Sequence, residues 1–139
     1  MRKLLCFLFV LLALGSCRKD EPEPEPGFKN LAGRWLVTAR EEMSNGEKVW
    51  VPSTASAPVY LIFRFDGLII NERGETGCCF SYDYIVNGEK ISVIPKAELK
   101  YPGNCALVDC FSCTLGLDFS GDDLIVTGCF GFKTKYVRD

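Results

Sequence analysis

Cysteine is the residue type in this chain best suited to chemistry. The sequence has eight cysteines; Cys6 lies in an apolar amino-terminal segment, and Cys17 lies where that segment ends. An even number of cysteines in an exported domain is typical of disulfide bonding. The sequence therefore predicts disulfides, with the pairing left open, among the six remaining cysteines: Cys78, Cys79, Cys105, Cys110, Cys113 and Cys129.

Three other uses of these cysteines compete with structural disulfides. Cys110 and Cys113 have the Cys-x-x-Cys spacing of redox-active dithiols, but a carboxylate directly before them disfavours a thiolate. Four thiolates can hold zinc, but only in reduced form. A catalytic cysteine would lack its usual base, because the chain contains no histidine. We expect disulfides, and the adjacent Cys78 and Cys79, which point to opposite faces of a strand, should bond different partners.

Carboxylate pairs give no better candidate for catalysis. Glu41 and Glu42 are neighbours and would point to opposite faces of a strand, while Asp122 and Asp123 lie in a predicted turn. The sequence contains no glycine-rich phosphate loop, nucleophile elbow or metal-binding motif. It therefore predicts a protein that is not an enzyme and that carries no metal and no cofactor.

The amino terminus has the pattern of an export signal. Arg2 and Lys3 precede an apolar run that is too short to span a bilayer, and the small residues Gly15 and Ser16 follow it. Residues 1–16 are therefore predicted to be a cleaved signal peptide. The next residue, Cys17, completes a Leu-Gly-Ser-Cys sequence that resembles the lipobox of bacterial lipoproteins, which implies that Cys17 is lipidated and anchors the chain to a membrane.

Residues 17–27 are predicted to form a tether between this anchor and the folded domain. The alternation of glutamate and proline cannot form a helix, because each proline lacks an amide donor and fixes its own φ. Lys19, followed by the acids Asp20 and Glu21, is similar to a signal for surface export in lipoproteins of one group of Gram-negative bacteria. The resemblance implies an outer-membrane protein displayed on the cell surface, with the inner face of that membrane as the alternative.

The remaining residues, 28–139, suit one domain. Removal of the signal peptide takes away two of the 16 basic residues and none of the 18 acidic ones, so the mature chain has a net charge of about −4. Binding to nucleic acid requires a concentrated basic surface. Nucleic acid is therefore not expected as a partner.

Period-two alternation dominates this domain and predicts an all-β fold. Asp66-Gly67 and Asn87-Gly88 each separate two alternating runs and are typical of type I′ hairpin turns. The second turn would place Tyr84 opposite Ile91 and Tyr82 opposite Val93, with Phe80 on the same face. A third turn is expected between Ser120 and Asp123, before a last strand. Consecutive hairpins favour an antiparallel up-and-down meander closed into a barrel of about eight strands, with a β-sandwich as the alternative.

The stretch from Leu31 to Ala39, with Gly33 and Trp35, resembles the Gly-x-Trp opening strand of lipocalins. The resemblance implies that Trp35 packs at the closed end of a lipocalin-like barrel, under a basic residue of the last strand such as Lys135 or Arg138. The chain departs from the family in lacking its Thr-Asp-Tyr element and its carboxy-terminal helix.

Two functions follow from such a barrel. In the first, it binds a small apolar or amphipathic molecule in a pocket. In the second, side chains fill the barrel, and the loops Met43–Pro58 and Lys100–Cys113 bind an envelope or extracellular protein. The first function would use the predicted lumen residues Phe63, Phe65, Tyr82, Tyr84, Ile91, Val93, Leu115 and Leu117.

Overall fold

The computed structural model describes residues 22–103, 105–111 and 113–139. The predicted signal peptide, Cys17 and Lys19 lie outside these residues. The described part consists of strands joined by turns and loops, with two short 3-10 helices. Their bounds are η1 (Pro26–Phe28), β1 (Gly33–Ser44), β2 (Glu47–Pro52), β3 (Tyr60–Phe63), β4 (Ile69–Ile70), β5 (Asp83–Val86), β6 (Glu89–Ser92), η2 (Cys105–Leu107), β7 (Leu115–Ser120), β8 (Asp123–Thr127) and β9 (Lys133–Arg138).

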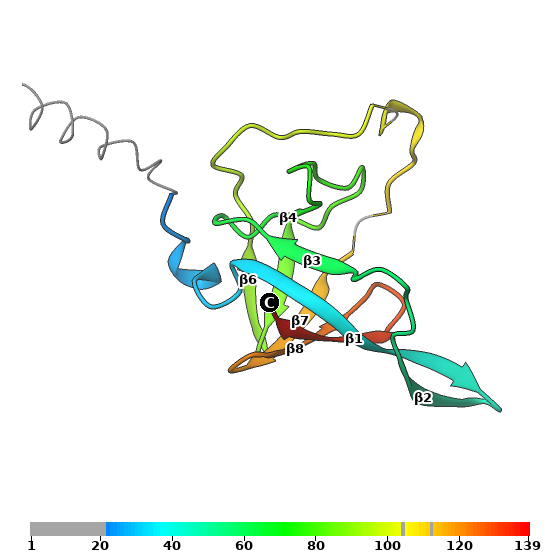
Figure 1. The fold of residues 1–139 in the computed structure, drawn as a ribbon. Coiled ribbons are helices and arrows are strands. Elements are labelled where there is room, and N and C mark those ends of the chain that lie inside the picture. Colours follow the sequence, from blue (N-terminus) through cyan, green and yellow to red (C-terminus); the bar gives the residue numbers. More distant parts are fainter. Residues whose placement is uncertain (1–21, 104, 112) are drawn as a thin grey trace, which may run out of the picture.

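The strands form one sheet that curls into a half-barrel (Figure 1). The strand order is β4-β3-β1-β9-β8-β7-β5-β6, and β2 pairs with the far half of the long strand β1. The prediction of a barrel-like all-β fold is confirmed. The β1–β2 hairpin projects from the body of the sheet, and the loop that follows β6 lies at the other end of the view (Figure 1).

Local turn chemistry explains most of the hairpins. Asn87 and Gly88 both have positive φ (48° and 87°), as a type I′ turn requires, and they place Tyr84 opposite Ile91 as predicted. At the Asp66-Gly67 turn the prediction of two positive φ values is wrong. Only Gly67 has one (86°), since the turn is one residue longer and its amide bonds back to the Arg64 carbonyl at 2.9 Å.

One strand contact differs from an antiparallel meander. β7 lies beside β5 rather than β6, and the two strands run parallel, with Tyr84 opposite Leu115 and Val86 opposite Leu117. The end of β6 lies opposite the start of β5, and the segment 93–114 carries the chain from there to the other side of β5 before β7 begins. Parallel neighbours need such a long connection.

The concave side of the sheet is filled by side chains. A contiguous cluster of buried residues includes Trp35 of β1, Phe63 of β3, Tyr84 of β5, and Leu117 of β7. Inward residues alternate with outward ones along each strand, so neighbouring strands contribute side chains to the same cluster. The cluster is completed by Phe28, Leu31, Leu68, Val86, Val93, Leu124 and Val126.

The segment before β1 closes one end of this core. The amide of Glu25 donates to the Phe65 carbonyl at 2.8 Å, and Phe28 is buried, so the last residues of the predicted tether already pack on the domain. Phe28 lies so close to Gly67 that a β-carbon at that glycine would approach the Phe28 ring to 2.5 Å. Gly67 therefore serves both the turn and the packing of Phe28.

Trp35 lies at the same end, under a basic residue of the last strand. Its indole N–H donates to the Leu31 carbonyl at 2.8 Å, and the Arg138 guanidinium lies 4.2 Å from the ring centroid. Arg138 also donates to the Ala32 carbonyl at 3.2 Å. Of the two basic residues expected above Trp35, Arg138 takes this place, while the Lys135 ammonium lies 4.1 Å from the Trp50 ring.

Candidate binding surface

The eight residues predicted to line a lumen occupy several environments. Four of them are buried in the core: Phe63, Tyr84, Val93 and Leu117. Two more, Ile91 and Leu115, are partly buried and pack against the core. Phe65 is half-buried just after β3, beside the Arg64 guanidinium. Tyr82 is 53% exposed. The structure thus brings six of the eight together, and these six fill the interior.

Tyr84 is at the centre of this filled interior. Its ring makes edge-to-face contacts with Phe28 and Phe63, with centroids 6.1 and 6.2 Å away. Its hydroxyl is buried and has no hydrogen-bond partner among the described residues. Burial, together with the nearby Asp66 carboxylate, raises the pKa of Tyr84, so the hydroxyl stays neutral. An aromatic side chain packed in this way is part of the core.

Tyr82 is only two residues away, and the expectation that it lines a lumen is wrong. The Val93 amide donates to its carbonyl at 2.6 Å, so the predicted pairing of Tyr82 with Val93 continues past the end of β5. However, the Tyr82 ring is not part of the core cluster, and it packs on Phe80 at the margin of that cluster, with ring centroids 4.5 Å apart. Tyr82 belongs to an outer aromatic surface.

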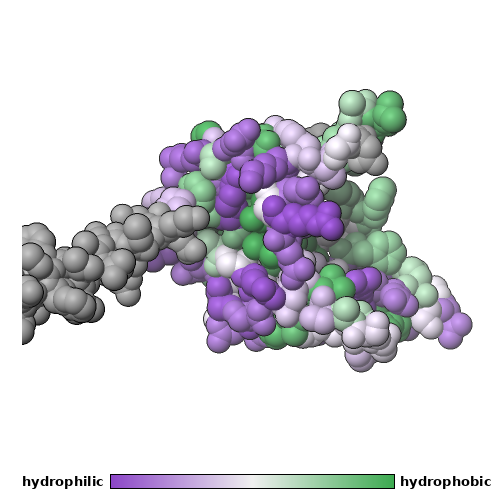
Figure 2. Space-filling view, turned by 45° about the horizontal axis from the view of Figure 1, so that its top comes forward, coloured by the Kyte–Doolittle hydropathy of each residue, from purple (hydrophilic) through white to green (hydrophobic). Residues whose placement is uncertain are grey.

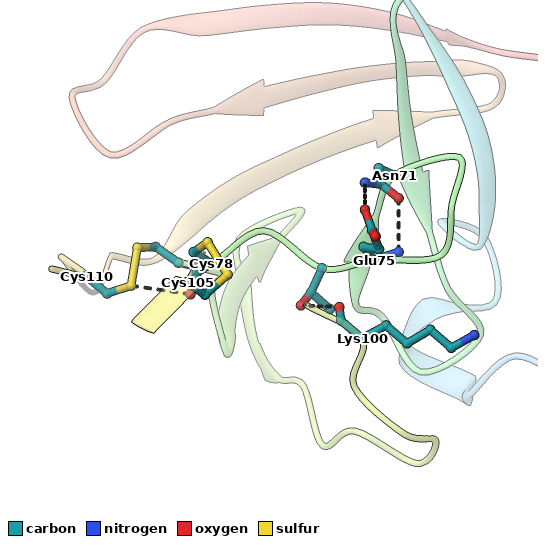
Figure 3. Close-up of a disulfide and its surroundings, with 8 residues drawn as sticks. Asn71, Glu75, Cys78, Lys100, Cys105 and Cys110 are labelled. Atoms are coloured by element: carbon teal, nitrogen blue, oxygen red, sulfur yellow. Dashed lines mark hydrogen bonds between the residues drawn. A yellow bond between two sulfur atoms is a disulfide. The ribbon is translucent and has the colours of Figure 1, made fainter. Parts of the chain in front are cut away.

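Three disulfides organise the chain around that surface. Cys78 bonds Cys105 and Cys79 bonds Cys110, as expected for neighbours that point in opposite directions. Figure 3 shows the Cys78–Cys105 bridge with Cys110 beside it. The third disulfide joins Cys113 to Cys129 in the β8–β9 loop. Cys110 and Cys113, the two cysteines of the Cys-x-x-Cys spacing, therefore bond different partners and do not form a dithiol pair.

These bridges hold apolar side chains at the surface. Leu107 is 91% exposed and Phe111 is 75% exposed, and both belong to the short segment that Cys78 and Cys79 anchor. A pocket of about 280 Å³ lies between the Cys79–Cys110 bridge and four aromatic rings. Figure 2 shows hydrophobic residues gathered at the upper right end of the molecule. We define the loop patch as Phe80, Tyr82, Tyr101, Leu107, Val108 and Phe111.

A buried ion pair fixes the chain segment that leads into the loop patch. The Asp66 carboxylate accepts two hydrogen bonds from Arg64, at 2.7 and 2.8 Å, and one from the Lys96 amide at 2.8 Å. Arg64 also donates to the Glu98 carbonyl at 3.1 Å. Burial alone would raise the pKa of Asp66, but the Arg64 hydrogen bonds and charge and the Lys96 amide together lower it. Asp66 is therefore ionised at neutral pH and joins the β3–β4 turn to the segment after β6.

The next contacts along this segment come from the loop before the adjacent cysteines. Thr76 is buried, and its amide and hydroxyl donate to the Lys100 carbonyl at 2.8 and 3.2 Å. Asn71 orders the same loop, because its side chain accepts from the Glu75 amide at 3.0 Å and donates to the Glu75 carboxylate at 2.9 Å (Figure 3). Tyr101 is thus presented from a fixed backbone.

The other predicted contact loop has a different structure. Most of Met43–Pro58 belongs to the β1–β2 hairpin, which turns at Asn45-Gly46 with φ values of 52° and 84°. Trp50 is exposed on this hairpin, next to Lys135. The sequence therefore misidentified a strand as part of a loop, although the Asn-Gly pair is a hairpin signal.

Comparison with known protein families, curated proteins and solved structures finds no match to this chain. Within the described residues, no helix is long and apolar enough to cross a membrane. The same residues contain no cluster of histidine, cysteine, aspartate or glutamate suited to hold a metal ion. The resemblance to lipocalins stays a prediction.

Sequence analysis placed Tyr101, Leu107, Val108 and Phe111 in a contact loop, Lys100–Cys113, but did not single out these side chains, and it placed Phe80 and Tyr82 on one face of a strand. Leu107, Val108 and Phe111 do not alternate with polar residues, so strand periodicity gives them no role. The signal that points to them is their position between cysteines. Apolar side chains in a short cross-linked segment have little core to enter, and they stay exposed.

Proposed function

We propose that this chain is an interaction module, anchored in a membrane and displayed on the cell surface, that binds another protein through the loop patch. The observation that carries the proposal is the contrast between a filled interior and exposed aromatic residues held by disulfides. Exposed apolar patches of this kind mark protein interaction sites. Tyrosine and phenylalanine supply contact area with few rotatable bonds, and the disulfides reduce the conformational entropy lost on binding.

The geometry gives less support to the alternative, a carrier of a small apolar molecule inside the barrel. A ligand needs space, but Phe63, Tyr84 and Leu117 occupy the centre and contact one another through a continuous core. An eight-stranded barrel is narrow enough for side chains to fill it. The pocket beside the Cys79–Cys110 bridge is lined by four aromatic residues, which suits an anchoring side chain of a protein partner.

The location of the protein rests on its amino terminus. The signal peptide, the lipidated Cys17 and the acidic run after it support an outer-membrane lipoprotein displayed at the cell surface. Replacement of Cys17 by alanine should abolish metabolic labelling with palmitate and release the domain from the membrane fraction. Labelling that persists in Cys17→Ala would refute lipidation at this residue.

Photo-crosslinking on cells tests the binding site. Phe111 is replaced by the photoreactive benzoylphenylalanine in the full chain, and Ile94, which is also exposed at 69%, is replaced in the matched control. The expected result is one discrete crosslinked protein at position 111 and none at position 94. The change Tyr101→Ser, combined with the probe at position 111, should reduce the crosslink at least tenfold without changing the amount of folded protein.

The contrary results are equally clear. Equal crosslinking from both positions, or an adduct that Tyr101→Ser leaves unchanged, would contradict binding through the loop patch. Native mass spectra of the purified full chain decide the alternative. A bound small molecule, lost on denaturation and retained in Tyr101→Ser, would favour the carrier function.

A further inference from the structure

The outer edge of β2 has no strand partner among the described residues. β2 pairs only with β1, and among the described residues no backbone hydrogen bond reaches its outer side. The other two edge strands are partly covered. Ile70 of β4 forms a bridge with Thr76, and Gly27 lies against Ile91 of β6.

Hydrogen-bonded and non-hydrogen-bonded pairs alternate along β1 and β2, and this alternation identifies which backbone groups of β2 face outward. Ser44 and Glu47 flank the two-residue turn, so they form a hydrogen-bonded pair, and the pairs at Val49 and Val51 follow the same pattern. The amides and carbonyls of Lys48 and Trp50 therefore point away from β1. The backbone of Pro52 also faces away from β1, where it presents a carbonyl but no N–H group.

The usual protection of an edge strand, charged residues and proline, is confined to the two ends of β2, Glu47-Lys48 and Pro52. Proteins often guard such an edge with a charged side chain, most often lysine. The Lys48 ammonium instead donates to the Gly131 carbonyl at 2.6 Å, so it folds back over its own β8–β9 loop. The run Val49-Trp50-Val51 remains, with Val49 and Trp50 both exposed.

We propose that β2 is a self-association site at which two copies of this chain pair antiparallel about a two-fold axis at Trp50. In that register the two Trp50 residues exchange two hydrogen bonds, and each Lys48 amide donates to the Pro52 carbonyl of the other copy. Pro52 has no amide to donate, but its carbonyl accepts a hydrogen bond in this register. Each Val49 faces a Val51, and the two indole rings lie side by side.

Competing registers are less complementary. A two-fold axis at Lys48 pairs each Trp50 with Gly46 of the turn and each Glu47 with Val49. An axis at Val49 leaves Pro52 opposite the turn at Gly46 and pairs each Glu47 with a valine. The interface is isologous, as a two-fold dimer requires. It lies on the projecting β1–β2 hairpin and does not use the loop patch, so it is independent of the proposed function (Figure 1).

A charge swap tests both the interface and its register. The full chain in mild detergent should sediment as a dimer, Val49→Lys should halve the sedimenting protein mass, and Val49→Lys with Val51→Glu should restore the dimer. Restoration is specific to the axis at Trp50, because only that register places residue 49 of one copy opposite residue 51 of the other. The proposal would be overturned if the wild type stayed monomeric at concentrations up to 100-fold above those used for the variants. It would also be overturned if Val49→Lys left the dimer unaffected.

Cysteine crosslinking decides the question if the charged variants do not fold. Hydrogen-bonded partners in an antiparallel pair have Cα atoms about 5.5 Å apart, within the range that a disulfide spans. Trp50→Cys should therefore give a covalent dimer under mild oxidation. Lys48→Cys is the matched control. In this register residue 48 of one copy lies opposite residue 52 of the other, so four residues at about 3.4 Å each separate the two introduced cysteines. Equal crosslinking of the two variants, or none from Trp50→Cys, would refute this pairing.

Discussion

Tyr82 and Tyr84 lie two residues apart and face the same side of the chain, yet one is 53% exposed and the other is completely buried. Around Tyr84 the sheet itself supplies the packing, from strands on both sides and from Phe28 at the end. Around Tyr82 the sheet has ended, and disulfides replace the core as the means of fixing the chain. The molecule thus has one region held by burial and one held by covalent bonds, and only the second leaves aromatic residues available to a partner.

The largest expected effect separates these two tyrosines directly. Tyr84→Ala removes a buried ring from the core and should lower the free energy of unfolding by about 3 to 5 kcal/mol. Tyr82→Ala, the matched control, should cost about 1 kcal/mol or less. Urea denaturation followed by circular dichroism measures both. Equal losses for the two variants would show that the distinction between the regions is wrong.

Removal of one disulfide should affect the second region most. Cysteines 27 residues apart constrain the unfolded chain by about 3.5 kcal/mol in the chain-entropy estimate, so Cys78→Ser with Cys105→Ser should lower the global free energy of unfolding by about that amount. Hydrogen exchange at the amide of Tyr84 should rise only as far as this global loss requires, and residues 94–111 should exchange faster still through local opening. Equal protection in the two regions would show instead that they open together.

Gly67 tests how tightly the Phe28 end of the core is closed. Gly67→Ala combines a positive φ with a clash against the Phe28 ring and should destabilise the protein by about 2 to 4 kcal/mol. Gly88→Ala is the control, because Gly88 has nearly the same φ and open space around it. It should cost about 1 kcal/mol. Thermal unfolding compares the two, and similar shifts in Tm would contradict close packing of Phe28.

Acid should weaken the link between the two regions. The pKa of Asp66 is lowered in the folded state, so its contribution to stability is present above the pKa of the unfolded chain, near 4, and is lost as the pH falls through the folded value. Wild type should therefore exceed Asp66→Asn in stability at pH 7, and the difference should shrink below about pH 4. A difference that is constant from pH 7 to pH 3 would contradict this role.

The smallest effect concerns the hydroxyl of Tyr84. Because this group is buried without a described partner, Tyr84→Phe should leave the free energy of unfolding unchanged or raise it by up to about 1 kcal/mol. Urea denaturation resolves the change. A loss of 2 kcal/mol or more would mean that the hydroxyl makes a hydrogen bond to a group outside the described contacts.

Features that depend on residues close together in the sequence were predictable from it. Asn87-Gly88 alone sets the register that puts Tyr84 opposite Ile91. The exposure of Tyr82 was not predictable in this way, because alternation gives the side of a strand and not what covers it. The parallel pairing of β5 with β7 and the partners of Cys78 and Cys79 depend on contacts far apart in the sequence. The loop Lys100–Cys113 was predicted as a contact loop, but its association with Phe80 and Tyr82 was missed for the same reason, since cross-links assemble the loop patch from two separated segments.

The order of the cysteines has a consequence for how the protein matures. The pairs Cys78–Cys105 and Cys79–Cys110 cross in the sequence, because each partner of the adjacent cysteines lies beyond both of them. An oxidant that joined cysteines in the order in which they are synthesised would pair neighbours in the sequence, such as Cys78 with Cys79 and Cys105 with Cys110. Correct pairing therefore requires either a sheet that folds before oxidation or an isomerase that exchanges the bonds afterwards, a process of seconds to hours. Refolding from the reduced state, with and without an isomerase, would distinguish these two routes.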